Sequence, residues 1–313
     1  MTPLQWDFAQ QIKHNRDGSF STQANRSHTL DLAARELREL GYNNLRAANL
    51  KQRHISALVK HWQHKGRTAA TIKNRMSHLR WSLEKLGKPG VAGLTNEQLG
   101  IEKRQYVAKL SKSIQLKSES LCLVLDPHIR MSLRLQQAFG LRREEALKIQ
   151  PALADRGDQL FLKASWAKGG RARSVPIRNI QQRQLLEEAQ KMVGVGSMIP
   201  PNRSYVEQLR IYESQTVAAG ICKAHGLRHH YAQQRYLELT GTQCPAVCAT
   251  IFAYLDACTA TFDFDTNAFP PPRIPEILAG QTSMGLDDKQ ARLLISAELG
   301  HSREQITAIY LGR

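Results

Sequence analysis

Four short segments of this 313-residue chain combine cationic, imidazole and phenolic side chains. In the first, Arg142 and Glu145 stand three residues apart, so on a helix they share one face and the carboxylate can orient the guanidinium. His225 and Arg228 have the same spacing in a second segment. Each pair therefore predicts polar groups that are presented from one side of a helix.

The other two segments contribute an amine and a phenol. Lys168 adjoins two glycines between the β-like runs 159–166 and 171–177, so we expect it at the tip of a β-hairpin. His301 and Tyr310 follow in the last part of the chain. Taken one at a time, such features are typical of surface ion pairs, solvated turns and packing residues. Their joint occurrence in this order, behind a basic helical region, indicates one site.

These residue types suit the cleavage of a phosphodiester by covalent catalysis. A tyrosine hydroxyl can attack the phosphorus and later be displaced by another hydroxyl, which divides one difficult step into two easier ones. Two arginines can bind the phosphate oxygens bidentately and stabilise the negative charge that develops. The leaving 5′ oxygen needs a proton, which a lysine can supply, and the phenol needs a proton acceptor within reach.

The order of the motifs is GLRxxE, then a hairpin lysine, then HxLRH, then LGH and a following tyrosine. This order resembles the catalytic signature of the tyrosine recombinase or phage integrase family. The resemblance implies that Tyr310 is the nucleophile and that Lys168 is the general acid. It also implies that Arg142 and Arg228 bind the scissile phosphate.

The resemblance assigns roles to the histidines and to one acidic residue as well. His225 would assist proton transfer, and His301 would form a hydrogen bond to the phosphate. Glu145 would support the site by orienting its neighbours. His229 is a further supporting candidate, although a packing role explains it equally well. The scheme requires no cofactor and no metal, and the sequence contains no Walker loop, no HExxH and no standard zinc spacing of cysteines.

The resemblance predicts a site-specific DNA recombinase that cleaves and rejoins strands through a 3′-phosphotyrosine, favouring the integration and excision of a mobile element. Its partners would be double-stranded DNA, further copies in a homotetramer on two DNA sites, and accessory DNA-bending proteins. Two alternatives stay open: a type IB-like topoisomerase, and a DNA-binding protein with a degenerate catalytic domain. The complete set of candidate catalytic residues argues against the second alternative.

Charge supports a polyanionic partner. The formal net charge is +17, of which residues 1–118 carry +13, and Leu40 to Leu83 holds nine Lys and Arg but no Asp or Glu. A solvated basic surface would explain this as well, but cations on helices that cross a duplex neutralise its phosphates. Residues 68–80 also resemble the DNA-facing helix of the family's core-binding domain. The candidates for DNA contact are Lys60, Lys65, Arg67, Lys73, Asn74, Arg75, Ser77, His78 and Arg80.

The hydrophobic pattern predicts a mostly α fold. We expect a flexible arm over 1–25 with room for one short helix, a helical (SAM-like) core-binding domain over 26–115, and an α+β catalytic domain with a small β-hairpin over 120–313. The interval between the last two motifs is longer than the family usually has, which predicts an insertion at 240–289. No apolar run approaches the roughly 20 residues of a bilayer span, and the start has no apolar signal core. We therefore expect a cytoplasmic, DNA-associated protein.

Apolar residues at three- and four-residue steps, with Gly and Pro as stops, place the individual helices. In the N-terminal half the expected helices cover 27–40, 51–63, 68–86 and 96–112. In the C-terminal half they cover 126–139, 142–149, 180–193, 205–219 and 227–239, with a final helical stretch from 289 to the end. The interval 241–289 reads as irregular.

Overall fold

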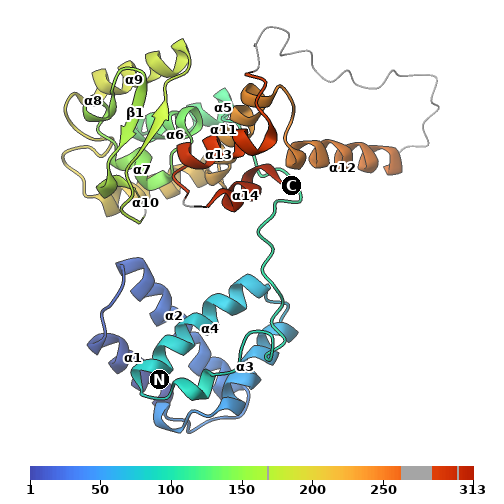
Figure 1. The fold of residues 1–313 in the computed structure, drawn as a ribbon. Helices are drawn as coiled ribbons and strands as arrows, with labels where there is room; N and C mark the ends of the chain where they lie inside the picture. The colour runs from blue at the N-terminus through green and yellow to red at the C-terminus, as the bar shows by residue number, and fades with distance from the viewer. Residues whose placement is uncertain (168, 262–283, 302) are drawn as a thin grey trace. The chain divides into compact units, whose positions relative to one another are not determined.

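The computed structural model describes residues 1–167, 169–261, 284–301 and 303–313. These residues form two compact units, Met1–Gln105 and Tyr106–Arg313 (Figure 1). Both are mainly helical, and the second holds one two-stranded antiparallel sheet in its described part. The predicted fold class, mostly α with one small hairpin in the C-terminal part, is confirmed.

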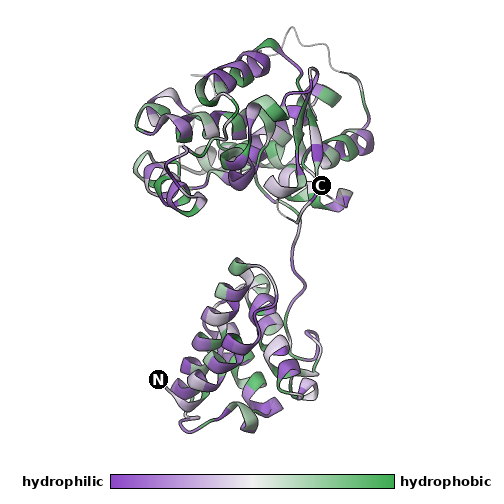
Figure 2. Cartoon of the chain, turned by 90° about the vertical axis from the view of Figure 1, so that its left-hand side faces the viewer, coloured by the Kyte–Doolittle hydropathy of each residue, from purple (hydrophilic) through white to green (hydrophobic). Residues whose placement is uncertain are grey.

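The N-terminal unit is a bundle of amphipathic helices. Its elements are α1 (Pro3–His14), α2 (Phe20–Glu39), η1 (Ala47–Asn49), α3 (Gln52–His64), α4 (Ala69–Lys85) and η2 (Pro89–Ala92). Hydrophilic and hydrophobic segments alternate along these helices (Figure 2). Their apolar sides meet in one core that includes Leu30, Leu58, Trp62 and Met76. Thr68 caps α4 by accepting a hydrogen bond from the Thr71 amide, as its position before the apolar stripe suggests.

The prediction of a flexible arm over 1–25 was wrong, although the one short helix that it allowed is present as α1. The chain is helical from Pro3, where Thr2 and Gln5 form a capping box. Leu4 and Phe8 lie one turn apart and are each 2 % exposed, because both belong to the core of the unit. The partly buried Ile12 packs on the same core one further four-residue step along, so three apolar side chains among polar neighbours anchor the helix.

The helix predicted over 96–112 is also absent from the structure. Residues 96–100 form a turn, and residues 101–117 contain no regular element. The amides of this stretch bond outside it instead: Ala108 N donates to Ala308 O, and Ile114 N donates to Gly226 O. The compact N-terminal unit accordingly ends at Gln105, before the boundary that the sequence suggested.

The second unit is built around one central helix. Its helices are α5 (Ser118–Cys122), α6 (Pro127–Phe139), α7 (Arg143–Lys148), α8 (Pro151–Ala154), α9 (Ile180–Val193), α10 (Tyr205–Ala218), α11 (His225–Thr240), α12 (Pro245–Thr261), α13 (Asp288–Glu298) and α14 (Ala308–Leu311), with the short helices η3 (Ala164–Trp166) and η4 (Glu304–Thr307). Strands β1 (Gln159–Leu162) and β2 (Arg173–Pro176) pair antiparallel, with Leu162 opposite Arg173. Helix α11 contacts α6, α13 and α14, so elements far apart in sequence meet on it.

Helix α12 corrects a further prediction, since 241–289 was expected to be irregular. The sequence of this helix is apolar almost throughout, so it shows none of the polar and apolar alternation that marks a surface helix. Residues 262–283 lie outside the described part, and the proposed insertion at 240–289 remains a prediction. In the parts of the chain that the structure describes, no helix has the length and hydropathy of a membrane span.

Candidate functional site

Arg228 lies at the centre of the candidate site. Its side chain is fully buried, and its guanidinium donates to the carbonyl oxygens of Gly140 and Leu299. Its Nε lies 3.3 Å from the Tyr310 hydroxyl. Burial, with the nearby Arg142, lowers the pKa of Arg228 to about 10, so the guanidinium remains charged at neutral pH.

Two helix ends hold this buried cation. Helix α6 ends at Gly140, whose φ is +61°, and α13 ends beside Gly300, whose φ is +63°. A Cβ on Gly140 would lie 2.6 Å from the Tyr231 ring, so a glycine is needed there both for the conformation and for the close packing. Each turn aims a terminal carbonyl at Arg228, and helix C-termini carry the partial negative charge that suits a cation.

Tyr310 is presented by the one-turn helix α14. Its side chain is almost completely buried, and its hydroxyl lies 3.5 Å from His225 Nε2. The rings of His229 and His301 lie 4.5 Å and 5.4 Å from the tyrosine ring, measured between centroids. The phenol is therefore surrounded by three imidazoles and one guanidinium of the same chain.

The three histidines are neutral near pH 7. Burial and the charge of Arg228 lower the pKa of His225, so its ring can accept a proton. Burial also lowers the pKa of His229 to about 4, and of His301 to about 3. His301 Nε2 lies 3.4 Å from Arg228 Nη2, which can only donate, so we assign the single ring proton of His301 to Nδ1.

Arg142 and Glu145 form the predicted pair at the start of α7. The Arg142 amide donates to Glu145 Oε2 at 2.6 Å, and Arg142 Nη1 donates to Oε1 at 2.8 Å. Arg142 Nη2 also reaches Leu299 O at 3.3 Å. The Arg142 side chain is 24 % exposed, so this guanidinium is oriented by protein groups and still accessible to a ligand.

Arg173 completes the site, and sequence reasoning missed it. It extends from β2, and its two terminal nitrogens donate to the two carboxylate oxygens of Glu145, both at 2.6 Å. Its Nε donates to Glu298 O at 2.9 Å. Burial alone would raise the pKa of Glu145, but Arg173, the Arg142 amide and Arg228 lower it to about 2. An arginine inside a predicted strand gave a signal too general to single it out.

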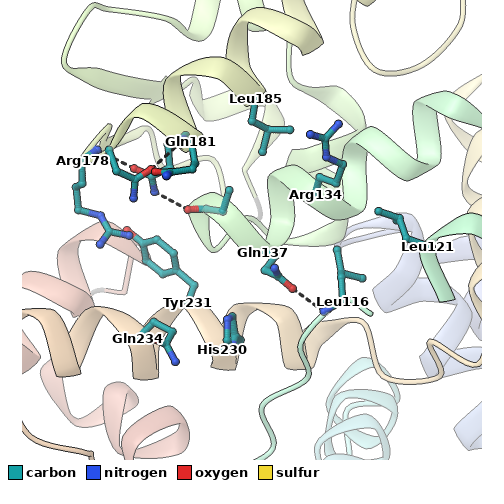
Figure 3. A pocket seen from close by; sticks show the side chains of 13 residues that line it. Leu116, Leu121, Arg134, Gln137, Arg178, Gln181, Leu185, His230, Tyr231 and Gln234 are labelled. Carbon is teal, nitrogen blue, oxygen red and sulfur yellow. Dashed lines mark hydrogen bonds between the residues drawn. The ribbon is translucent and has the colours of Figure 1, made fainter. Parts of the chain in front are cut away.

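The structure thus brings together seven of the eight residues predicted for the site, namely Arg142, Glu145, His225, Arg228, His229, His301 and Tyr310. Lys168 lies outside the described residues, although its flanking strands pair as expected. A cavity of about 440 Å³ between α6, α9 and α11 is lined by none of these residues, so it is separate from the candidate site (Figure 3).

All nine DNA-contact candidates are at least partly exposed, but Arg75 and Arg80 are bound closely within the N-terminal unit, and Lys65 lies 3.9 Å from Glu36 and 3.6 Å from Glu39. Lys60, Lys65, Arg67, Asn74 and Ser77 are exposed, and Lys73 and His78 are partly exposed. We call these seven residues, on α3, on α4 and in the turn between them, the basic face. Arg75 instead lies over the Trp62 ring at 5.1 Å and 3.8 Å from Glu36.

Arg80 is likewise directed inward. Its guanidinium donates to Leu94 O at 2.9 Å, to Asn96 Oδ1 at 3.2 Å and, through Nε, to Ala92 O at 3.4 Å. These bonds fasten the loop after η2 to α4. The structure therefore gives Arg75 and Arg80 roles within the N-terminal unit that their sequence context did not reveal.

Comparison with protein families places the chain in one class. The model described as "Phage integrase, N-terminal" matches residues 1–92, and the model described as "Integrase" matches residues 107–234. The first match covers the helical N-terminal unit, including α1, and the second covers most of the elements that carry the candidate site. The chain belongs to the tyrosine recombinase family of phage integrases.

Solved structures share this fold at low sequence identity. The chain is similar to XerH site-specific recombinase bound to a palindromic difH substrate, with 14% identity, a TM-score of 0.55, and coverage of 99% of this chain and 81% of that chain. It is also similar to the Tn1549 transposon integrase in complex with circular intermediate DNA, with 12% identity, a TM-score of 0.51, and coverage of 100% and 96%. No curated protein matches the chain.

Proposed function

We propose that this chain is a site-specific DNA recombinase that cleaves and rejoins strands through a 3′-phosphotyrosine on Tyr310. One observation carries the proposal: the Tyr310 hydroxyl lies 3.3 Å from Arg228 Nε and 3.5 Å from His225 Nε2 in a single cluster. A nucleophile, a cation that can bind the phosphate and a proton acceptor are then within reach of one another. Membership of the recombinase family supports the same chemistry.

In the cleavage step, Tyr310 Oη forms a bond to the scissile phosphorus, and the bond from phosphorus to the 5′ oxygen breaks. The phenolic proton passes to the neutral ring of His225. The 5′ oxygen takes up a proton, and we assign Lys168 as its donor. Rejoining reverses these transfers, with a DNA 5′ hydroxyl displacing the tyrosine.

Arg142 and Arg228 would stabilise the negative charge that develops on the phosphate oxygens, and the neutral His301 would donate a hydrogen bond to one of them from Nδ1, which has no partner in the described part of the chain. A guanidinium has five N–H donors, and the two carbonyls, the phenol and the His301 ring that Arg228 contacts take up four of them, which leaves one for a phosphate oxygen. Because protein groups already hold both arginines in place, little reorganisation is needed when the charge appears. Glu145 and His229 act as positioning residues in this scheme.

The basic face of the N-terminal unit would hold the duplex. Its lysines and Arg67 neutralise backbone phosphates, and Asn74, Ser77 and His78 reach toward base edges. We further propose that four copies assemble on two DNA sites, with accessory DNA-bending proteins, in the service of a mobile element. A solved relative, the lambda integrase, is a dimer bound to a core site in one structure.

Trapping on nicked duplex DNA tests the chemistry. A pool of nicked duplexes with a randomised site supplies the substrate, and adducts that survive detergent are collected. The wild type should form such an adduct and Tyr310→Phe should not. Tyr212→Phe is the matched control, because it removes another buried hydroxyl, bonded to Gln136, without touching the site.

Two results would overturn the proposal: an adduct with Tyr310→Phe, or no adduct with the wild type on any duplex in the pool. Once a site has been selected, strand exchange between two copies of it distinguishes recombination from simple relaxation of supercoils. Recombinant products are expected, whereas relaxation without exchange would indicate a topoisomerase.

A further inference from the structure

The segment that follows the N-terminal unit in sequence, residues 106–117, is bonded to both helices that carry the reacting groups; we call it the strap. The Ala108 amide donates to Ala308 O at 2.9 Å, at the first residue of α14. The Ile114 amide donates to Gly226 O at 3.1 Å, within the first turn of α11. The strap therefore touches the helix of Tyr310 and the turn that bears His225 and Arg228.

The contact with α11 is close. A Cβ on Gly226 would lie 2.6 Å from Ile114 Cγ1 and 2.7 Å from Lys112 O, so only a glycine allows the strap to lie there. Farther along, the Leu116 amide donates to Gln137 Oε1 at 2.7 Å, which ties the strap to α6 as well (Figure 3). The strap is thus fixed at several points along its length.

A side-chain relay connects the strap to the nucleophile. Ser111 Oγ lies 2.9 Å from Gln233 Oε1, and Gln233 Nε2 lies 2.9 Å from Tyr310 O. Because a carbonyl only accepts, the amide nitrogen of Gln233 must face Tyr310, and the Ser111 hydroxyl must then donate to the amide oxygen. The Ser111 amide donates to Thr250 Oγ1 at 2.7 Å, which holds this serine in place.

Helix α14 needs such support. It contains four residues, Ala308–Leu311, and a single helical turn is not stable by itself. Its position must therefore come from tertiary contacts. Gln233 is 4 % exposed and bonds to the main chain of Tyr310 itself, so it acts directly where the phenol is attached.

We propose that Gln233 is a positioning residue for the nucleophile and that Ser111 of the strap completes it. Together they fix the main chain of Tyr310, and thereby the position of the hydroxyl relative to Arg228 and His225. The inference rests on the proposed function of Tyr310. Neither Gln233 nor Ser111 touches the DNA or the reacting atoms in this assignment.

Single-turnover cleavage of the nicked duplex by full-length variants at saturating concentration tests this role. Gln233→Leu keeps the size of the side chain but loses both hydrogen bonds, and should slow cleavage by roughly 10- to 100-fold, the scale of a misplaced reacting group. Ser111→Ala should slow it by roughly three- to tenfold, and Ser111→Thr, which keeps the hydroxyl, should restore the rate. The double variant should be little slower than Gln233→Leu, because both changes break one chain of bonds.

Two neighbours provide matched controls that should cleave at the wild-type rate. Gln234→Leu alters an exposed glutamine beside Gln233, and Ser113→Ala alters a strap serine that faces His230 instead. A positioning role lowers the rate but leaves DNA affinity and melting temperature unchanged. If Gln233→Leu also lowers the melting temperature, its slower cleavage could come from lost stability. The variants Ser111→Ala and Ser111→Thr, at a half-buried position, then show whether the hydrogen bond itself sets the rate.

The outcomes separate this inference from the proposed function. No adduct with the wild type overturns both. An adduct with the wild type but not with Tyr310→Phe upholds the nucleophile, and wild-type cleavage by Gln233→Leu and Ser111→Ala then overturns the relay alone. A loss of DNA affinity as large as the loss of rate would also overturn it, because a positioning residue acts after binding.

Discussion

The substitution Glu145→Gln should destabilise the protein far more than its small change in shape suggests. Glu145 is 0 % exposed and accepts two hydrogen bonds from Arg173 and two from Arg142. Glutamine has one acceptor oxygen and would turn amide N–H groups toward donors of the arginines. It would also leave the buried Arg173 without its carboxylate.

The size of the effect follows from the pKa of this carboxyl. Burial opposes ionisation, but Arg173, the Arg142 amide and Arg228 lower the pKa from 4.5 to about 2. Such a lowering corresponds to about 3 kcal/mol of stability, and removing one partner of a buried ion pair typically costs about 3–5 kcal/mol. Because the ionised form stabilises the fold, this contribution is complete above pH 4.5 and is lost as the pH falls toward 2.

Urea unfolding of the full chain at pH 7 measures the difference. Glu145→Gln should lower the free energy of unfolding by about 3–5 kcal/mol, and the gap to the wild type should narrow below pH 4.5. Glu144→Gln is the matched control, because Glu144 is 40 % exposed, pairs with Lys148, and should cost less than about 1 kcal/mol. A loss below about 1 kcal/mol for Glu145→Gln, or a gap that stays constant through the acid range, would refute the reasoning.

Three further substitutions test other contacts. Arg173→Lys keeps the charge but loses the two-pronged bond, so unfolding should become easier by about 2 kcal/mol and cleavage should slow. Gly140→Ala places a Cβ against the Tyr231 ring at a residue in the left-handed conformation, so the free energy of unfolding should fall by about 3 kcal/mol in the same urea assay. An unchanged free energy of unfolding would contradict this expectation. Lys73→Ala should reduce the slope of log DNA affinity against log salt concentration by about 1, because one phosphate contact is lost. Arg80→Ala should mainly lower the melting temperature of the N-terminal unit.

The residues of the candidate site could be predicted because their motifs are short and local. Arg142 and Glu145 share one turn, as do His225 and Arg228, and the order of the motifs carried the rest. Arg173 could not be found in this way, because its partner Glu145 is 28 residues away in sequence and meets it only when β2 packs against the helices of the unit. Pairing between distant segments leaves no spacing signal in a single sequence.

The N-terminal unit shows the same limit for helices and charges. Helices with a clear apolar stripe, such as α3 and α4, were predicted to within a few residues, whereas α1 was allowed only as one short helix within a flexible arm, because few apolar residues mark it. Charge counting could not separate Lys73 from Arg80, because the two have similar exposure and only the donors of Arg80 are occupied by a loop. That distinction depends on where the chain after η2 returns, which is a tertiary property.

The partners of the arginines explain how the site can be both preformed and attractive to phosphate. Arg173 and Arg142 share the single carboxylate of Glu145, so the three groups together keep one positive charge. Arg228 is held by the carbonyls of Gly140 and Leu299, which fix its geometry without neutralising it. Since the three histidines are neutral, the cluster retains a net positive charge, which matches a phosphodiester that becomes more negative as the phenol attacks. Because carbonyls at helix ends, and not a second carboxylate, hold the buried Arg228, its positive charge remains for the proposed chemistry.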